Sequence, residues 1–257
     1  MTQPAPALRF DVDAVVLDIE GTTSATGFVV DVLCPYSRSR FAALLAERGA
    51  DPEVARAVAQ VRELTGDPRA DAAAVVKTLG TWLDEDRKAT PLKTLQGLIW
   101  SQGFARGDLV AHFYDDVVPA FRAWHAAGLR LYVYSSGSVA AQRAWFSSTP
   151  EGDLLPLLSG LHDTENAGPK QEPESYRRIA HSTRLTPERL LFLSDRPGEL
   201  DAARAAGWHT VGIRRPGEPY FEQGVGDHAQ AGTFDEISVD TTGSDPTRSD
   251  PTRSDTT

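Results

Sequence analysis

The sequence contains a single cysteine, Cys34, among its 257 residues. One thiol excludes an internal disulfide and a thiolate cluster for zinc. Long apolar runs are also missing, because the apolar stretches are as short as single strands or are interrupted by charged residues, and none approaches the roughly 20 residues that a membrane-spanning helix needs. The N-terminal segment lacks the basic and then apolar pattern of a signal peptide. We therefore expect a cytoplasmic protein with no membrane partner.

Positive charge is scarce. Lys and Arg total 26 against 36 Asp and Glu, which gives a formal net charge of -10 and a pI near 5.1. Such a chain repels a polyphosphate backbone, so we expect no nucleic-acid partner. The hydrophobic fraction of 40% is enough for a packed core. The length fits one domain that carries an insertion, or two small domains.

Short apolar segments that end in small polar or acidic residues recur along the chain. Three of them predict buried strands of a parallel sheet, at residues 14–17, 129–134 and 190–193. Helix-like segments follow the second and third strands, and a further strand is predicted at 209–213. Strands joined through helices, with reactive residues at the strand tips, predict an α/β fold: a Rossmann-like, doubly wound parallel sheet.

The first and second predicted strands are separated by far more residues than one crossover helix requires. This stretch shows helical periodicity, for example at Leu92, Leu95 and Ile99. We therefore expect a helical cap at 30–118, inserted into a catalytic core that is formed by 1–29 and 119–239.

The C-terminal segment 240–257 differs in kind from the rest. The pentapeptide SDPTR occurs there twice in tandem, and no apolar residue follows Val239. Without apolar surface to bury, nothing offsets the entropy cost of ordering, so we predict a disordered tail with no catalytic part. The alternative is that the tail binds a partner.

Asp18 and Glu20 follow the first predicted strand. Residues two apart in an extended segment point to the same side, so the two carboxylates can share a pocket, and the following Gly21 permits a close turn. One carboxylate can attack a phosphoryl group while the other transfers the proton. The alternative is that Asp18 caps a turn and Glu20 is simply solvated.

Asp195 lies at the tip of another predicted strand, with Glu199 four residues later. Carboxylates from two strand tips repel each other unless a cation lies between them, and hard oxygen ligands favour magnesium. The sequence therefore predicts a magnesium site at these tips. The alternative is that Asp195 is a helix N-cap and Glu199 begins a surface face.

The segment from Ser135 to Ser138 connects a strand to a helix, where N–H groups and hydroxyls converge on an anion. It predicts a phosphate site, although an ordinary turn with an N-cap fits it too. Lys170 lies in a Gly- and Pro-containing loop, where a lysine is usually solvated but can also reach a phosphate.

Taken in order along the chain, these signals resemble the haloacid-dehalogenase-like phosphatases, which also carry a helical cap after the first motif. The resemblance implies a role for each of five positions: the nucleophile Asp18, the general acid/base Glu20, the phosphoryl-binding Ser135 and Lys170, and the magnesium ligand Asp195.

A narrower resemblance covers roughly residues 14–217. The stretches LDIEGTT, FVVDVLCPY, LKTLQGLIW, YSSGSVAAQ and FLSD are similar to the enolase-phosphatases of methionine salvage, also called acireductone synthases. That family implies a bifunctional reaction on the small substrate 2,3-diketo-5-methylthiopentyl-1-phosphate: enolisation, and then dephosphorylation to 1,2-dihydroxy-3-keto-5-methylthiopentene. The alternatives are a magnesium-dependent phosphatase with a single function on another small phosphate ester, and a catalytically silent binding module.

The family resemblance also implies a ligand set. One Mg²⁺ per subunit is held by Asp18, Glu20 and Asp195, where Glu20 contributes its main-chain oxygen. The substrate contacts are Ser135, Ser136 and Lys170. The base for enolisation is left open: Glu20 is a candidate, and a cap residue such as Lys93 or Gln96 is a candidate to assist. We expect a monomer.

Overall fold

The computed structural model describes residues 8–240. Its centre is a sheet of six parallel strands in the order β4-β3-β2-β5-β6-β7. The strands are β2 (Ala14–Leu17), β3 (Arg130–Tyr134), β4 (Leu158–His162), β5 (Leu190–Ser194), β6 (His209–Ile213) and β7 (Ala229–Ala231). The predicted doubly wound α/β sheet is confirmed.

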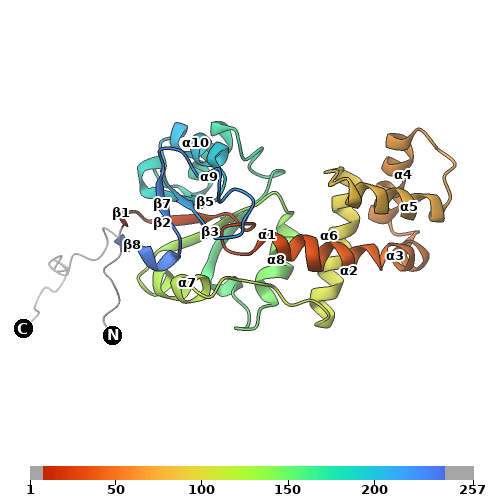
Figure 1. The fold of residues 1–257 in the computed structure, drawn as a ribbon, viewed down its shortest axis with the longest axis horizontal. Coiled ribbons are helices and arrows are strands. Elements are labelled where there is room, and N and C mark those ends of the chain that lie inside the picture. The colour runs from red at the N-terminus through yellow and green to blue at the C-terminus, as the bar shows by residue number, and fades with distance from the viewer. Residues whose placement is uncertain (1–7, 241–257) are drawn as a thin grey trace, which may run out of the picture.

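Helices cover both faces of this sheet, as Figure 1 shows. The four core helices are α7 (Val117–Ala126), α8 (Val139–Ser147), α9 (Pro173–Thr183) and α10 (Pro197–Ala205). Three short 3-10 turns accompany them: η2 (Leu155–Leu157), η3 (Pro187–Arg189) and η4 (Phe234–Glu236).

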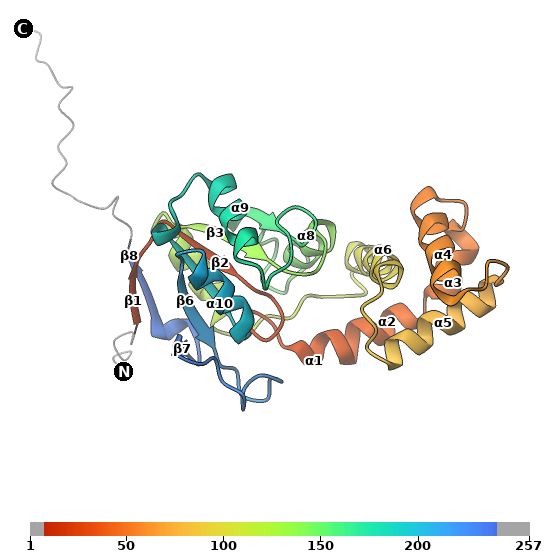
Figure 2. The same ribbon diagram turned by 90° about the horizontal axis from the view of Figure 1, so that it is seen from above.

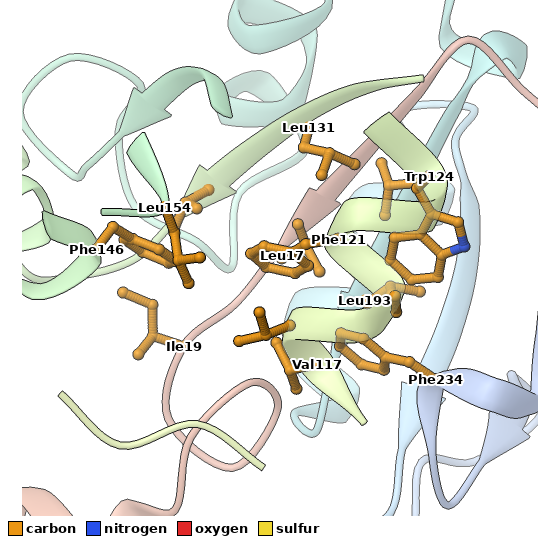
Figure 3. Close-up of a cluster of buried hydrophobic side chains, with 14 of the residues drawn as sticks. Leu17, Ile19, Val117, Phe121, Trp124, Leu131, Phe146, Leu154, Leu193 and Phe234 are labelled. Carbon is orange, nitrogen blue, oxygen red and sulfur yellow. The ribbon is translucent and has the colours of Figure 1, made fainter. Parts of the chain in front are cut away.

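The unbroken apolar sequence of β2 follows from burial on both faces. Val15 and Leu17 belong to a cluster with α7 and α8, whereas Ala14 and Val16 belong to a cluster with α9 and α10. Figure 3 shows the first cluster, to which Leu17 of β2 and Phe121 of α7 both belong.

The strand order places a topological switch point at β2. From β2 the chain runs outward through β3 and β4 and then returns to the other side of β2 for β5, β6 and β7. In the parallel register, Leu17 pairs with Val133 on one side and with Leu193 on the other. The segments after these three residues therefore emerge at one edge, where ligands of doubly wound sheets bind.

The segment from α1 to α6 forms what we call the cap. Its helices are α1 (Thr26–Phe28), the π-helix η1 (Val29–Leu33), α2 (Cys34–Arg38), α3 (Phe41–Arg48), α4 (Pro52–Thr65), α5 (Ala72–Asp84) and α6 (Thr90–Arg106). In Figures 1 and 2, α3, α4 and α5 lie away from the sheet, and α2 and α6 connect them to it. Caps and breakers in the sequence explain the boundaries of α4: Asp51 accepts a hydrogen bond from the N–H of Glu53, and Gly66 ends the helix in a left-handed conformation.

The cap has a hydrophobic cluster of its own, which includes Phe41, Val61, Leu79, Trp82 and Leu95. This separate cluster agrees with the division into a core and a cap at 30–118, which stays a prediction.

The edge strands β4 and β7 were not predicted from the sequence, and neither were two strands at the ends of the described range. The strands β1 (Leu8–Asp11) and β8 (Ile237–Asp240) form a second, two-stranded parallel sheet. The predicted tail therefore begins one residue too early, because Asp240 is the last residue of β8 and its carbonyl accepts the N–H of Val12 at 3.1 Å. The rest of that tail, 241–257, lies outside the described residues. Between residues 8 and 240, no helix combines the length and the apolar character that a membrane crossing requires.

Candidate active site

Asp18 is the first residue after β2, and its surroundings fix it on the carboxyl edge of the sheet. Its N–H donates to the carbonyl of Leu193 at 3.0 Å, which continues the pairing with β5 by one residue. The hydroxyl of Thr23 donates to the carbonyl of Asp18 at 3.1 Å. The side chain is 7% exposed, and its Oδ1 lies 2.6 Å from the ammonium of Lys170. A buried carboxylate is thus presented beside a cation.

Lys170 bridges two carboxylates. Its Nζ lies 2.6 Å from Asp18 Oδ1 and 2.6 Å from Glu199 Oε2, and its side chain is 8% exposed. Burial by itself lowers the pKa of this amine, but the two carboxylates outweigh burial and raise the pKa above its usual value. The loop that carries Lys170 is fixed to α9, because the hydroxyl of the buried Tyr176 donates to the carbonyl of Lys170 at 2.8 Å. Lys170 is therefore a permanent positive charge at the tip of β2.

The structure pairs Glu199 with Lys170. The helix α10 begins at Pro197, so Glu199 lies in its first turn. Besides its ion pair with Lys170, Glu199 accepts a hydrogen bond from the hydroxyl of Ser194 at 2.9 Å. Burial raises the pKa of Glu199, and Lys170 acts in the opposite direction. The contacts point to Glu199 as the residue that holds Lys170 in place.

Asp195 lies in the loop after β5, and its N–H donates to the Thr22 hydroxyl at 3.0 Å. Its carboxylate sits over Gly21, whose φ is +74°; a Cβ added there would lie 2.2 Å from Asp195 Oδ2. Only glycine fits at this position. Burial and then the charge of Asp18 raise the pKa of Asp195 to about 8. Asp195 Oδ1 is buried and has no hydrogen-bond partner within residues 8–240.

Glu20 has an exposed side chain at a crowded point of the surface. Reduced solvation, followed by the charge of Asp18, raises its pKa, while Lys88 of the cap is the first of the cations that lower it. A carboxyl group whose pKa is raised binds a proton more firmly than an ordinary carboxylate, which suits a group that takes up and returns protons.

Ser135 and Ser136 follow β3, the neighbour of β2. Ser135 is buried, and its hydroxyl accepts a hydrogen bond from the N–H of Gly137 at 3.2 Å; Ser136 is exposed. The buried Gln142 supports this loop, because its side-chain amide donates to the carbonyls of Gly137 and His162, both at 2.8 Å. The loop therefore has a fixed shape before any anion binds.

The cap residues proposed to assist differ in their surroundings. Lys93 is exposed, whereas Gln96 is buried, and its amide lies 3.7 Å from the sulfur of Cys34. The loop between α5 and α6, which carries Lys88, lies on the side of the cap that faces the core (Figures 1 and 2). Sequence reasoning gave no role to Lys88, which belongs to no motif. It also gave none to Thr22 and Gln142, although they lie within LDIEGTT and YSSGSVAAQ, because the residue type alone does not show that they support neighbouring loops.

A divalent cation fits this site. Within the described range, no three His, Cys, Asp or Glu side chains are arranged to hold a metal by themselves. The predicted set needs only two carboxylates and one main-chain oxygen. Asp195 supplies a buried oxygen that has no hydrogen-bond partner among the described residues, and hard oxygen donors suit magnesium.

The site combines a buried carboxylate at the switch point, a lysine beside it and an acidic loop after the next strand, which are the features expected of a haloacid-dehalogenase-like hydrolase. The family model that is described as haloacid dehalogenase-like hydrolase matches residues 12–207. The match includes the strands β2 to β5 and the cap, and it ends before β6.

Curated relatives narrow this class. The protein named Enolase-phosphatase E1 from Streptomyces avermitilis is 80% identical over 230 residues, which cover 90% of this chain and 96% of that relative. Enolase-phosphatase E1 from Frankia alni is 51% identical over 240 residues, covering 93% and 99%. The chain belongs to the enolase-phosphatase E1 family of haloacid dehalogenase-like hydrolases.

Solved structures share the fold. The UTR4 protein from Saccharomyces cerevisiae superposes with a TM-score of 0.71 at 29% identity, covering 87% of this chain and 99% of that one. CbbY from Rhodobacter sphaeroides, solved in complex with phosphate, gives 0.54 at 18% identity, covering 88% and 96%.

Proposed function

We propose that the protein is a bifunctional enolase-phosphatase of methionine salvage, which converts 2,3-diketo-5-methylthiopentyl-1-phosphate through its enol to 1,2-dihydroxy-3-keto-5-methylthiopentene and phosphate. The observation that carries the proposal is the buried Asp18 carboxylate, held by Lys170 at the tip of β2, with Glu20 two residues away. The names of the relatives described above support the choice of substrate.

In the phosphatase step, an oxygen of Asp18 attacks phosphorus, and the bond from phosphorus to the leaving oxygen breaks. Glu20 in its protonated form gives its proton to that leaving oxygen. Water then attacks the aspartyl phosphate, Glu20 takes the proton from this water, and Asp18 and phosphate are released. Ser135, Ser136 and Lys170 bind the phosphoryl oxygens.

In the enolase step, a proton leaves the carbon that bears the phosphate. Glu20 in its ionised form is a candidate base, because its raised pKa increases its basicity. The enol is complete once a proton is returned to the carbonyl oxygen, from Glu20 or from solvent. A single carboxylate can then serve both steps, provided that Glu20 takes up a proton from solvent before the phosphatase step. Lys93 and Gln96 remain candidates to assist from the cap.

We infer that Asp18, Asp195 and the main-chain oxygen of Glu20 hold one Mg²⁺. When bound, the ion supplies positive charge that neutralises the phosphoryl group and polarises an oxygen of the enolising substrate. The buried, unpartnered Oδ1 of Asp195 supports this assignment. We further propose that the enzyme is a cytoplasmic monomer whose partner is this small phosphorylated diketone.

The test mixes the protein with Mg²⁺ and the diketo phosphate and follows enol absorbance and free phosphate in the same sample. A transient enol followed by phosphate is the expected result. Phosphate without enol, or phosphate only from other esters, would leave a phosphatase with a single function and remove the methionine-salvage assignment.

The variant Asp18→Asn separates the two steps. Phosphate release should fall by about 10³-fold or more because the nucleophile is lost. The enol should still form and should accumulate, because Glu20 is unchanged, although it should form more slowly because the proposed Mg²⁺ site loses one carboxylate. Asp227→Asn, at an exposed position, is the control and should behave as wild type. Phosphate release that survives in Asp18→Asn would rule out Asp18 as the nucleophile.

A further inference from the structure

The chain crosses between the core and the cap twice, and the two crossings lie side by side. The outward crossing joins β2 to α1, and the return crossing joins α6 to α7. The N–H of Tyr114 donates to the carbonyl of Thr23 at 3.1 Å, and the N–H of Ala25 donates to His112 Nδ1 at 3.3 Å. Any change in the angle between the cap and the core must therefore move both crossings together.

One carboxylate contacts both crossings. Glu218 lies in the loop between β6 and β7, far from either crossing in sequence. Both of its carboxylate oxygens lie 3.2 Å from the N–H of Thr26, on the outward crossing, and its Oε1 accepts the hydroxyl of Tyr114 at 2.6 Å, on the return crossing. Glu218 thus connects the start of the cap to its end.

The loop that carries Glu218 is itself fixed to the core. Arg215 is 4% exposed and makes a two-pronged ion pair with Asp116, with both distances 2.9 Å. Its guanidinium also donates to the carbonyl of Thr22 at 3.2 Å, and it lies over the ring of Tyr114. Glu218 is therefore held from a rigid base.

Thr26 begins the continuous helical stretch that runs through α1, η1 and α2 into the cap (Figure 2). A carboxylate at the first N–H groups of a helix is favourable, because those groups have no partner within the helix. Burial and then Glu218 raise the pKa of Tyr114, so its hydroxyl stays protonated and remains a donor. The contact sets the direction in which the helical stretch leaves the core.

We propose that Glu218 and Tyr114 are positioning residues for this enzyme: together they hold the first helical stretch of the cap at the angle at which the cap covers the substrate. The inference rests on the proposed function, since it assigns the methylthio end of the diketo phosphate to the cap. Both residues act through the hinge and not on the reacting atoms. A substrate too small to reach the cap is insensitive to them.

The experiment compares the diketo phosphate with acetyl phosphate, which has no chain to reach the cap. Glu218→Ala should raise the KM for the diketo phosphate by about tenfold, the equivalent of one lost charge-assisted hydrogen bond, and change its kcat much less. The kcat/KM for acetyl phosphate should stay within about twofold of wild type, because this substrate makes no contact with the cap that the variant could weaken. Tyr114→Phe should give a smaller rise of about threefold in the KM for the diketo phosphate, because one neutral donor is lost.

The conservative variant Glu218→Gln keeps an amide oxygen that accepts from Tyr114, so it should recover most of the affinity. Glu222→Gln, at an exposed position of the same loop, is the matched control. Hydrogen exchange gives a readout without substrate: the amide of Thr26 should exchange faster in Glu218→Ala.

Equal losses with both substrates, or an unchanged KM for the diketo phosphate, would overturn the positioning role. If the wild-type protein hydrolyses acetyl phosphate but not the diketo phosphate, the proposed function fails. The exchange of the Thr26 amide then decides the positioning role alone: faster exchange in Glu218→Ala supports it, and unchanged exchange overturns it.

Discussion

Lys170 at the edge of the sheet and Lys88 in the cap each pair with a carboxylate, but in opposite surroundings. The side chains of Lys170 and Asp18 are 8% and 7% exposed, whereas those of Lys88 and Asp86 are 69% and 83% exposed. Water screens the second pair almost completely, while the first pair must satisfy its own charges. The core therefore holds its charged groups in place before substrate arrives. In the cap, by contrast, a charged side chain can be replaced with little change in the free energy of unfolding.

The hydrophobic clusters repeat this contrast. The core packs two large clusters on opposite faces of one sheet, and the cap packs a single smaller cluster between its helices. A change in the cap cluster should therefore alter the cap first and leave the edge of the sheet intact. Four substitutions or pairs of substitutions test this difference.

The largest effect is expected for Lys170→Met. The change removes the cation between Asp18 and Glu199 and leaves two buried carboxylates without the charge that neutralises them. Phosphate release should fall by about 10²- to 10³-fold. The free energy of unfolding should fall by about 3–5 kcal/mol in urea with EDTA present, so that no added cation replaces the lost charge. A loss of activity with unchanged stability would show that the ion pairs contribute nothing to the fold.

Leu79→Ala tests the cap cluster. Leu79 is fully buried, and its truncation should lower the free energy of unfolding by about 3 kcal/mol. Acetyl phosphate hydrolysis at a temperature where the protein stays folded should not change, because Leu79 belongs to neither core cluster. Leu64→Ala, at an exposed position of α4, is the control. A parallel loss of acetyl phosphate hydrolysis would mean that cap packing and the core site are not independent.

A pH effect is expected from the core at His162. Burial lowers the pKa of this imidazole, so the folded protein binds its proton less readily than the unfolded chain. The unfolded chain then takes up the proton first as pH falls, and the free energy of unfolding should decrease below about pH 6.5, by at most about 1.4 kcal/mol per pH unit. His162→Phe should flatten this slope in urea titrations, and His181→Phe, at an exposed position, should not. Equal slopes in all three proteins would contradict the assignment.

The smallest effect is expected for Arg38→Ala in the cap. Arg38 pairs with Asp84, and their side chains are 45% and 68% exposed. The free energy of unfolding should change by less than about 1 kcal/mol, and this small change should disappear in high salt. A loss comparable to that of Lys170→Met would remove the distinction between the buried and the solvated charges.

The strands that position the site were predictable from the sequence, and the outer strands were not. β2 and β5 are continuous apolar runs because both of their faces are buried. By contrast, β4 has the sequence LSGLH with no fully buried residue, and β7 has only three residues. β4 and β7 are the edge strands of the sheet, and they lack the continuous buried apolar run by which the inner strands were predicted.

The candidate site shows the same limit. Asp18 and Asp195 could be grouped from the sequence, because parallel strands bring their carboxyl ends to one edge, whereas Lys170 was added only by the resemblance to the phosphatase family. The partner of Glu199 was not predictable, since the spacing to Asp195 says nothing about a lysine in a loop before α9. The contact between Tyr114 and Glu218 spans 104 positions and has no local signal.

The pairing of β1 with β8 makes the described chain nearly a closed ring. The two strands are parallel, with Leu8 opposite Ile237 and Asp11 opposite Asp240, so the two ends of residues 8–240 lie one short strand length apart at the end of the core opposite the cap (Figure 2). A short linker from Asp240 to Leu8 would close that ring, and the chain could then be opened in the turn between α4 and α5. Such a circular permutant would place both new ends at the far side of the cap, where dyes or tags report on cap movement without touching the sheet.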